Sequence, residues 1–307
     1  MPNDKFKNYL HLHFLVFIAG FTAILGELIS IGSTALVWYR MLIAGVLMFT
    51  YIKIIKLKIQ VSKKTKLKFF GAGIIIALHW ITFFEAINQS NISITLAMFS
   101  TGAFFASFIE PLIYKRKIIW YEILFGIIVI IGVFLITQSE IKYLNGILLG
   151  IVSALFSTLF AVINGKFIAK HRATVISFYE FISGVVFLSL FILVFQGGFS
   201  TDFFILKTSD WIYILILASI CTAYSFIGSV NVMRHLSPYT LILTYNLEPL
   251  YGIALALLLF PETEIMSTQF YYGAFLVLAT VLADGILKNY KRHVKRSRLM
   301  SKADTHQ

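Results

Sequence analysis

Glu248 is the residue of this sequence that is hardest to explain by packing alone. It stands in the middle of a long apolar stretch and is followed directly by Pro249. An ionised carboxylate within a membrane costs at least a few kcal/mol, so such a residue faces a partner or a wet cavity. Proline removes a backbone N–H and leaves a carbonyl one turn earlier without its helical partner. The two residues together predict a broken helix at a ligand or ion site.

Four other residues are candidates for the same site. Tyr245 and Asn246 precede Glu248 directly and are expected to be its hydrogen-bonding neighbours. His79 and Trp80 lie in the middle of another apolar run, at a similar depth. Histidine changes charge near neutral pH, and tryptophan offers a flat face to a cation or an apolar ligand. His79 is therefore either a coupling residue beside Glu248 or a buried packing residue, and Trp80 is either a wall of the substrate site or part of the core.

Arg40 and Glu27 are charged residues toward the outer ends of the first two apolar runs. One interpretation is a salt bridge that joins two helices. The other is that Arg40 holds a substrate carboxylate, or that Glu27 binds a cation. Ser157 belongs to a run with small residues at four-residue spacing, a pattern that favours close helix packing, although Ser157 is also a candidate lining residue of the substrate cavity.

Glu180 and Glu110 are the other acids that need an interpretation. Glu180 lies about a third of the way into its run, and Lys166 and Lys170 are near enough to reach it, so it is either a gate or half of a structural pair. Glu110 lies five residues before a basic loop and is interpreted as a structural acid at a helix end.

The elements that carry these residues are membrane-spanning helices. Of 307 residues, 59% are hydrophobic and only 13% are charged, which places the chain far outside the range of soluble proteins. Apolar runs close to the ~20 residues that a helix needs to cross a bilayer predict ten transmembrane helices and an all-α membrane protein. The runs are at 12–31, 34–55, 68–88, 92–114, 119–137, 144–166, 173–195, 210–232, 238–260 and 268–288.

Along the chain, loops rich in basic residues alternate with loops that contain few of them. With the N-terminus in the cytoplasm, 23 of the 26 Lys and Arg residues fall on the cytoplasmic side, and Lys142 and Lys207 fall outside. Positive charge near the ends of spans marks the cytoplasmic side. We therefore expect a multi-pass protein of the cell (inner) membrane with both termini in the cytoplasm.

The two halves of the chain resemble each other. Tyr39-Arg40 aligns with Tyr179-Glu180, and setting Ile92 on Pro238 places Gly102 opposite Glu248. Each half has an odd number of helices, so the second half is inserted upside down, as in many secondary transporters. The predicted units are a first five-helix repeat at 1–138, a second, inverted repeat at 139–290, and a basic cytoplasmic tail at 291–307.

Three segments carry a resemblance to a known family. They are W-Y-R-M-L-I-A from Trp38, the small-residue pattern of the run that begins at Gly146, and L-S-P-Y-T-L-I-L-T-Y-N-L-E-P-L-Y from Leu236, with Glu262 after it. In this order and spacing the chain resembles the EamA-like transporters of the drug/metabolite transporter superfamily. The resemblance implies transport of small metabolites by alternating access, with a central cavity between the halves, and it favours export.

The sequence therefore predicts a secondary carrier for a small metabolite, an amino acid or similar, that exports its substrate and is coupled to a proton gradient. Glu248, His79 and Glu27 are the candidate coupling residues. The alternative is a structural or assembly membrane protein without transport activity. We expect no enzyme activity, catalytic residue, metal or cofactor, since no such motif occurs. The expected partners are the substrate and membrane lipid, with no nucleic acid, and the expected state is a monomer or homodimer.

Overall fold

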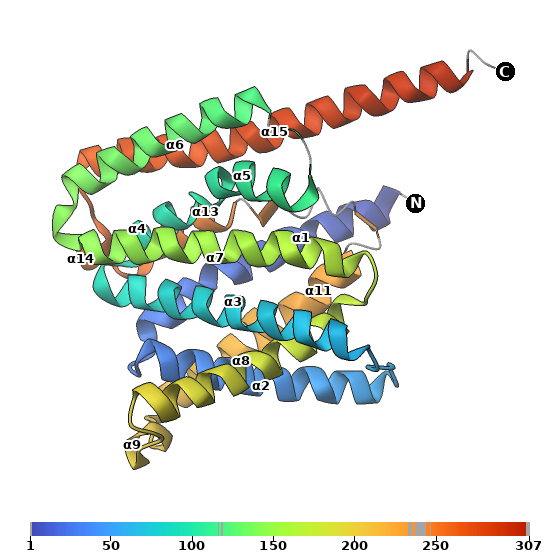
Figure 1. Cartoon of the computed structure of the whole chain (residues 1–307). Helices are drawn as coiled ribbons and strands as arrows, with labels where there is room; N and C mark the ends of the chain where they lie inside the picture. Colours follow the sequence, from blue (N-terminus) through green and yellow to red (C-terminus); the bar gives the residue numbers. More distant parts are fainter. Residues whose placement is uncertain are drawn as a thin grey trace.

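The computed structural model describes residues 2–115, 117, 119–232, 235–236, 244–245 and 247–304. These residues form helices and connecting segments, with no strand among them. Nine helices of this part of the chain are long and apolar enough to cross a membrane, and a shorter apolar helix lies at Glu248–Leu259. The predicted all-α class with ten helices is confirmed. The helices run roughly along one direction, and both termini lie at the same end of the bundle (Figure 1).

The first half of the chain begins with three long helices, continues through a broken one and ends with a fifth span. The elements are α1 (Pro2–Leu28), α2 (Ser33–Ile54), α3 (Lys63–Gln89), α4 (Ile92–Phe99), α5 (Gly102–Tyr114) and α6 (Trp120–Ser139). The sequence predicted a single helix at 92–114, but the structure breaks it at Ser100 and Thr101. Their hydroxyls donate to the carbonyls of Leu96 at 3.0 Å and Met98 at 2.6 Å. Such bonds compete with the helical ladder, and composition did not show the break.

The second half also contains interrupted helices. The elements are η1 (Ile141–Tyr143), α7 (Leu144–Ile168), α8 (Ala173–Phe195), α9 (Thr201–Phe204), α10 (Thr208–Ala218), η2 (Ser219–Tyr224), α11 (Ser225–Val232), α13 (Glu248–Leu259), α14 (Pro261–Glu264) and α15 (Thr268–Asp304). η2 is a π-helical segment that joins α10 to α11. Residues 238–243 and 246 of the predicted ninth helix lie outside the described residues. α15 continues well beyond the predicted end of its span and projects past the bundle (Figure 1).

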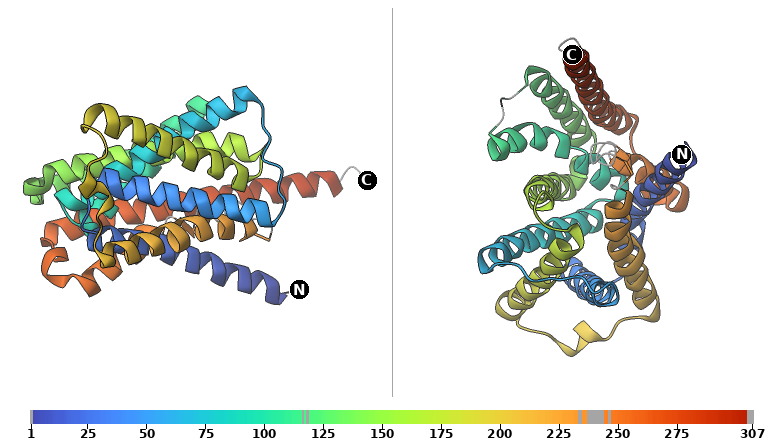
Figure 2. Two further views of the ribbon diagram at one scale, coloured as in Figure 1. Left: turned by 90° about the horizontal axis from the view of Figure 1, so that it is seen from below. Right: turned by 90° about the vertical axis from the view of Figure 1, so that its right-hand side faces the viewer.

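Glycines allow the closest contacts between helices. A Cβ at Gly146 of α7 would lie only 3.0 Å from the carbonyl oxygen of Ala86 in α3, and a Cβ at Gly150 only 2.8 Å from Met98 Cβ. α6 and α15 lie side by side in both views of Figure 2, and a Cβ at Gly132 would lie 2.9 Å from the Gly273 carbonyl oxygen. Small residues let helices approach closely in lipid, so the packing interpretation of the α7 pattern holds.

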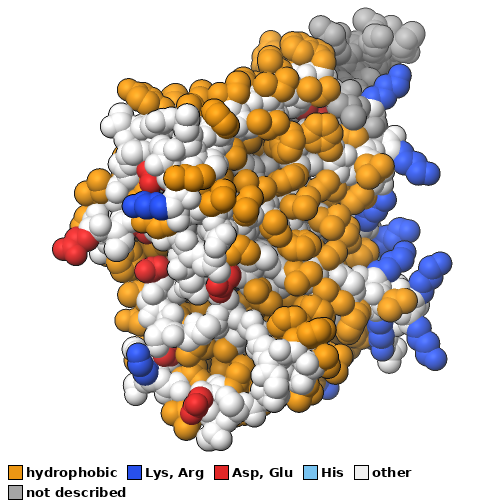
Figure 3. Space-filling view, turned by 60° about the vertical axis from the view of Figure 1, so that its left-hand side comes forward, with side chains coloured by type: hydrophobic (Ala, Val, Ile, Leu, Met, Phe, Trp, Pro, Cys, Tyr) orange, Lys and Arg blue, Asp and Glu red, His pale blue; other side chains and the backbone are white. Residues whose placement is uncertain are grey.

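The surface is divided as expected for a protein that spans a bilayer. Figure 3 shows a broad hydrophobic area with most of the visible Lys and Arg side chains gathered at one edge. Several acidic side chains lie toward the opposite edge of the same face. The asymmetry of charge seen along the sequence is therefore also an asymmetry between the two ends of the folded bundle.

Candidate functional site

Arg40 of α2 is the centre of the candidate site. Its side chain is only 4% exposed, and its Nε donates a hydrogen bond to Thr222 Oγ1 at 2.8 Å. The guanidinium carbon lies 3.9 Å from the centroid of the Trp80 ring. Nη1 is buried and has no hydrogen-bond partner. The bundle thus encloses a cation that is held by one hydroxyl and one aromatic face, with an N–H group still to be satisfied.

The predicted salt bridge between Arg40 and Glu27 is not formed, because no ion pair joins these two described residues. Glu27 is exposed near the end of α1, whereas Arg40 turns into the bundle toward α3 and η2. Burying a cation without an ionic partner is costly. The contact with the Trp80 face offsets part of this cost, since a desolvated cation–π contact stabilises by about 2 kcal/mol.

Thr222 was missed by the sequence analysis. It is fully buried in η2, where its hydroxyl donates to the Leu217 carbonyl at 2.8 Å while it accepts from Arg40. The bond to a carbonyl five residues earlier fits the wider π-helical turn, and such turns are frequent at functional sites. Its only signal in the sequence was a hydroxyl within an apolar run.

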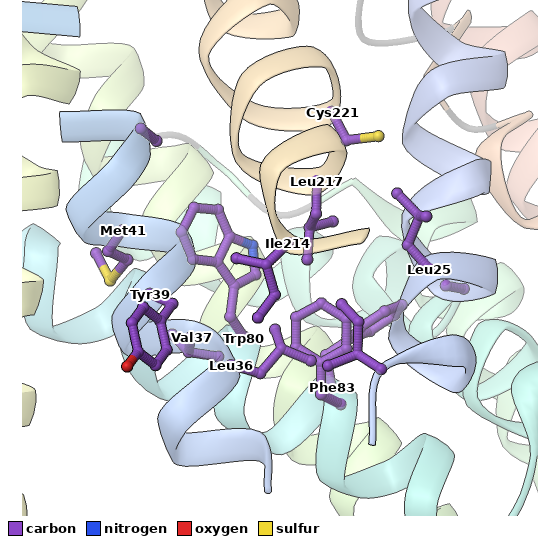
Figure 4. Packing of buried hydrophobic residues seen from close by; sticks show 14 of the residues in the cluster. Leu25, Leu36, Val37, Tyr39, Met41, Trp80, Phe83, Ile214, Leu217 and Cys221 are labelled. Carbon is purple, nitrogen blue, oxygen red and sulfur yellow. The ribbon is translucent and has the colours of Figure 1, made fainter. Parts of the chain in front are cut away.

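Apolar side chains surround the Trp80 ring. In Figure 4 the indole lies between side chains of α2, among them Val37, and side chains of α10, among them Ile214 and Leu217. These three neighbours are fully buried. Electrostatic interactions at this position are therefore stronger than they would be in water.

Glu248 is the first residue of α13, and Pro249 follows in the first turn. Proline fits this position, because the first N–H groups of a helix have no helical partner in any case. The Glu248 side chain is half-buried and interacts electrostatically with Arg40 across the interior. A Cβ at Gly20 of α1 would lie 3.1 Å from the Glu248 carbonyl oxygen, so α1 passes directly beside the start of α13.

Two helices of the described chain begin at the residues that the sequence alignment sets opposite each other. The alignment that placed Gly102 opposite Glu248 was made from sequence, and in the structure α5 begins at Gly102 and α13 at Glu248. The hydroxyl of Thr158 in α7 donates to the Gly102 carbonyl at 3.1 Å, which satisfies one backbone acceptor at the break. A half-buried Ser157 lies beside Thr158 on α7.

His79 and Trp80 are adjacent in the chain, but their side chains contact different residues. His79 Nδ1 lies 2.9 Å from Ser153 Oγ of α7, and its ring stacks on Phe99 with centroids 5.4 Å apart. Successive helical residues point about 100° apart. The structure therefore places Trp80 with Arg40, and His79 at the contact between α3 and α7.

Of the two residues predicted to be hydrogen-bonding neighbours of Glu248, the structure describes only Tyr245. The Tyr245 hydroxyl lies 3.0 Å from Ser229 Oγ of α11, whereas Asn246 lies outside the described residues.

Two histidines near the start of α1 were not among the residues predicted from the sequence. His11 Nε2 lies 2.8 Å from the Tyr224 hydroxyl, and His13 Nδ1 lies 3.1 Å from the Tyr251 hydroxyl, so α1 is tied to η2 and to α13.

The sequence predicts that a lysine pairs with Glu180, but the structure shows a different partner. It is 1% exposed and accepts a hydrogen bond from Asn164 Nδ2 at 2.9 Å. Lys166 instead donates to the Ile113 carbonyl at 2.6 Å. Among the described residues, Glu180 is thus a buried carboxyl with an amide partner.

A bundle of apolar helices that encloses charged and polar groups at membrane depth defines a class, the multi-pass membrane proteins with an internal polar site, to which transporters belong. The model of the EamA-like transporter family matches the chain twice, at residues 8–138 and 144–283, and the chain belongs to this family. It is therefore a membrane transporter built from two repeats, and its family is not one of enzymes.

Comparison with solved structures supports the fold. A crystal structure described only as that of a protein superposes with a TM-score of 0.62 at 11% sequence identity, over 91% of this chain and 97% of the other. At this identity the likeness concerns the fold alone. No curated protein matches the sequence.

Proposed function

We propose that this protein exports a small zwitterionic metabolite, an amino acid or similar compound, across the cytoplasmic membrane in exchange for protons. The observation that carries the proposal is the buried Arg40 guanidinium with its unpartnered Nη1. Alternating access would expose this group to one side of the membrane at a time, with the site between the two repeats.

A carboxylate is the ligand that fits Arg40. Guanidinium and carboxylate groups form short, charge-assisted hydrogen bonds, often two in parallel. Thr222 and Trp80 already hold the Arg40 side chain in place, so little further ordering is needed when a ligand arrives. A substrate carboxylate would also supply the partner that Nη1 lacks.

Glu248 fits the other end of a zwitterion. The carboxylate of Glu248 would accept the ammonium group of a substrate whose carboxylate lies on Arg40. A proton and an ammonium group compete for the same carboxylate, so Glu248 binds one or the other. Competition of this kind is the requirement for exchange, because the inward proton gradient then drives the substrate outward.

Ligand binding can be tested on the purified protein by thermal shift with a panel of amino acids. Each amino acid is paired with its amide, which lacks the carboxylate, and its deaminated analogue, which lacks the ammonium. A ligand that binds only the folded state raises the melting temperature by mass action. We expect a shift with an intact zwitterion, and no shift in Arg40→Gln. An unchanged ligand-induced shift in Arg40→Gln would refute the carboxylate site.

Coupling can be tested in proteoliposomes with Glu248→Gln, which keeps the size of the side chain but cannot titrate. We expect this variant to fold and to lose pH-driven net transport. Glu262→Gln is the matched control, an equal change at an exposed acid that is not a coupling candidate. Full pH-driven transport by Glu248→Gln would move the coupling role to His79 or Glu27. A protein that responds to no member of the panel, and whose variants only lose stability, would favour the structural alternative.

A further inference from the structure

A basic cavity lies between the α2–α3 linker and the α7–α8 turn. In Figure 1 these two segments lie at the end of the bundle where both termini are found. Its volume is about 450 Å³, within the range of small-molecule sites. Ile55, the lining residue at the end of α2, follows Arg40 by 15 residues, which is about 22 Å along a helix. Its lining residues are Ile55, Lys56, Leu57, Lys58, Gln60, Val61, Lys170, His171, Arg172 and Val175.

The lining is suited to an anion. It holds three lysines, one arginine and one histidine, and no acidic side chain is among the residues that line it. Arg172 is also the residue before α8, and Val175 belongs to the first turn of that helix. The free N–H groups at the start of a long helix add a partial positive charge, so side chains and backbone favour the same sign of ligand.

The walls of the cavity are held by specific contacts. The Tyr179 hydroxyl of α8 donates to the Ile59 carbonyl of the linker at 3.0 Å. Leu57 and Ile59 pack against the hydrophobic core. On the opposite wall, the ring of His171 lies 5.4 Å from the ring of Phe69. The linker is thus fastened to α8, and the cavity exists before any ligand enters.

Lys56 occupies a backbone position at which lysine is unusual. Its φ is 50°, in the left-handed region that favours glycine. The Leu57 N–H donates to the Ile52 carbonyl at 3.0 Å and the Lys56 N–H to the Lys53 carbonyl at 3.2 Å, which together form the glycine-type end of a helix. Glycine would therefore fit this position without strain.

We propose that this cavity binds the phosphodiester headgroup of an anionic membrane lipid. Lysine and arginine are the usual partners of phosphate, and basic pockets at the cytoplasmic ends of transmembrane helices suit anionic headgroups. α2 ends at the cavity, where the apolar Ile54 is 73% exposed and Ile55 is 43% exposed. Acyl chains can lie along these residues while the headgroup enters the cavity, an arrangement that a free phosphate would not require.

The test uses full-length, delipidated protein in detergent, titrated with phosphatidylglycerol or with phosphatidylcholine of the same acyl chains. The readout is the apparent melting temperature as a function of lipid concentration. The variants are Lys56→Gly and Arg172→Gln, which each remove one charge from the cavity. Lys64→Gln is the matched control, since Lys64 is an exposed lysine at the start of α3 and does not line the cavity.

We expect phosphatidylglycerol, but not phosphatidylcholine, to raise the melting temperature of the parent protein and of Lys64→Gln. Lys56→Gly and Arg172→Gln should each weaken this response about fivefold in lipid concentration, since each removes one basic contact to an anionic headgroup. Lys56→Gly should not lower the melting temperature without lipid, because glycine suits its backbone. This behaviour separates loss of the ligand from loss of the fold.

Two results would overturn the proposal. One is an equal effect of Lys64→Gln and the two cavity variants, which would mean that only overall charge matters. The other is saturation of the response by inorganic phosphate without lipid, which would assign the cavity to a soluble anion. Neither result bears on Arg40 or on transport, so the proposed function stands or fails separately.

Discussion

Gly73→Ala tests whether the two repeats meet as closely as the structure indicates. Gly73 of α3 faces α8, and a Cβ added there would overlap the Glu180 carbonyl oxygen and lie 2.6 Å from Ser183 Cβ. Backbone cannot move aside as a flexible side chain can. From the other side, a Cβ at Gly184 would lie 3.3 Å from the Gly73 carbonyl oxygen. The two helices therefore cross with almost no space between their backbones.

The magnitude follows from two opposing effects. Inserting a methyl group into a tightly packed contact costs about 1–3 kcal/mol. Replacing glycine by alanine in a helix returns up to about 1 kcal/mol. We expect Gly73→Ala to lower the free energy of unfolding by about 1–2 kcal/mol and to reduce transport, because the displaced α3 carries Trp80.

Gly71 provides the control on the same helix, since a Cβ there would meet nothing within 4 Å. Gly71→Ala should be neutral or stabilising by up to about 1 kcal/mol. The two variants should then differ by about 2 kcal/mol, which corresponds to roughly 4–8 °C in melting temperature by the scaling for soluble domains of 150–250 residues. Thermal unfolding followed by tryptophan fluorescence measures this difference. Equal melting temperatures for the two variants would refute the close crossing of α3 and α8.

Three further predictions concern topology and the site. A cysteine at Ser200 should react with an impermeant thiol reagent from outside intact cells, whereas one at Ser62 should react only after lysis; the reverse pattern would invert the topology. Thr222→Val should lower the free energy of unfolding by about 1.5–3 kcal/mol and weaken binding of the carboxylate ligand. Valine has the shape of threonine but removes the hydroxyl that accepts the hydrogen bond of Arg40 Nε. An unchanged melting temperature would show that Arg40 does not depend on Thr222. Glu27→Gln should change the free energy of unfolding by less than about 0.5 kcal/mol, because Glu27 is exposed and no described residue forms an ion pair with it. A large loss of stability would indicate that Glu27 does form the salt bridge with Arg40 that the sequence predicts.

The sequence predicted most residues of the candidate site but not the contacts between them. Arg40, Trp80 and Glu248 were all recognised, because polar or charged groups are rare at membrane depth and each one needs an explanation. Their arrangement was not recognised. Arg40 was paired with Glu27, its neighbour along the chain, and Thr222 was not considered. Glu248 of α13 lies close enough to Arg40 of α2 for their charges to interact, which no local pattern could show.

The sequence by itself determined the class of the fold, the number of spanning segments and the asymmetry of charge between their ends. It did so because a helix in lipid must satisfy its own backbone and present apolar side chains, so length and composition are sufficient. It also predicted two repeats, which the family match at residues 8–138 and 144–283 confirms.

Only the tertiary structure decided which polar group meets which. His79 meets Ser153 rather than Glu248, and Glu180 meets Asn164 rather than a lysine. The break after α4 and the π-helical turn at η2 were likewise seen only in the tertiary structure. A buried polar group takes the partner that packing brings within hydrogen-bond distance, and in a bundle that partner comes from a helix far away in the chain. Spacing along the sequence carries no information on that distance.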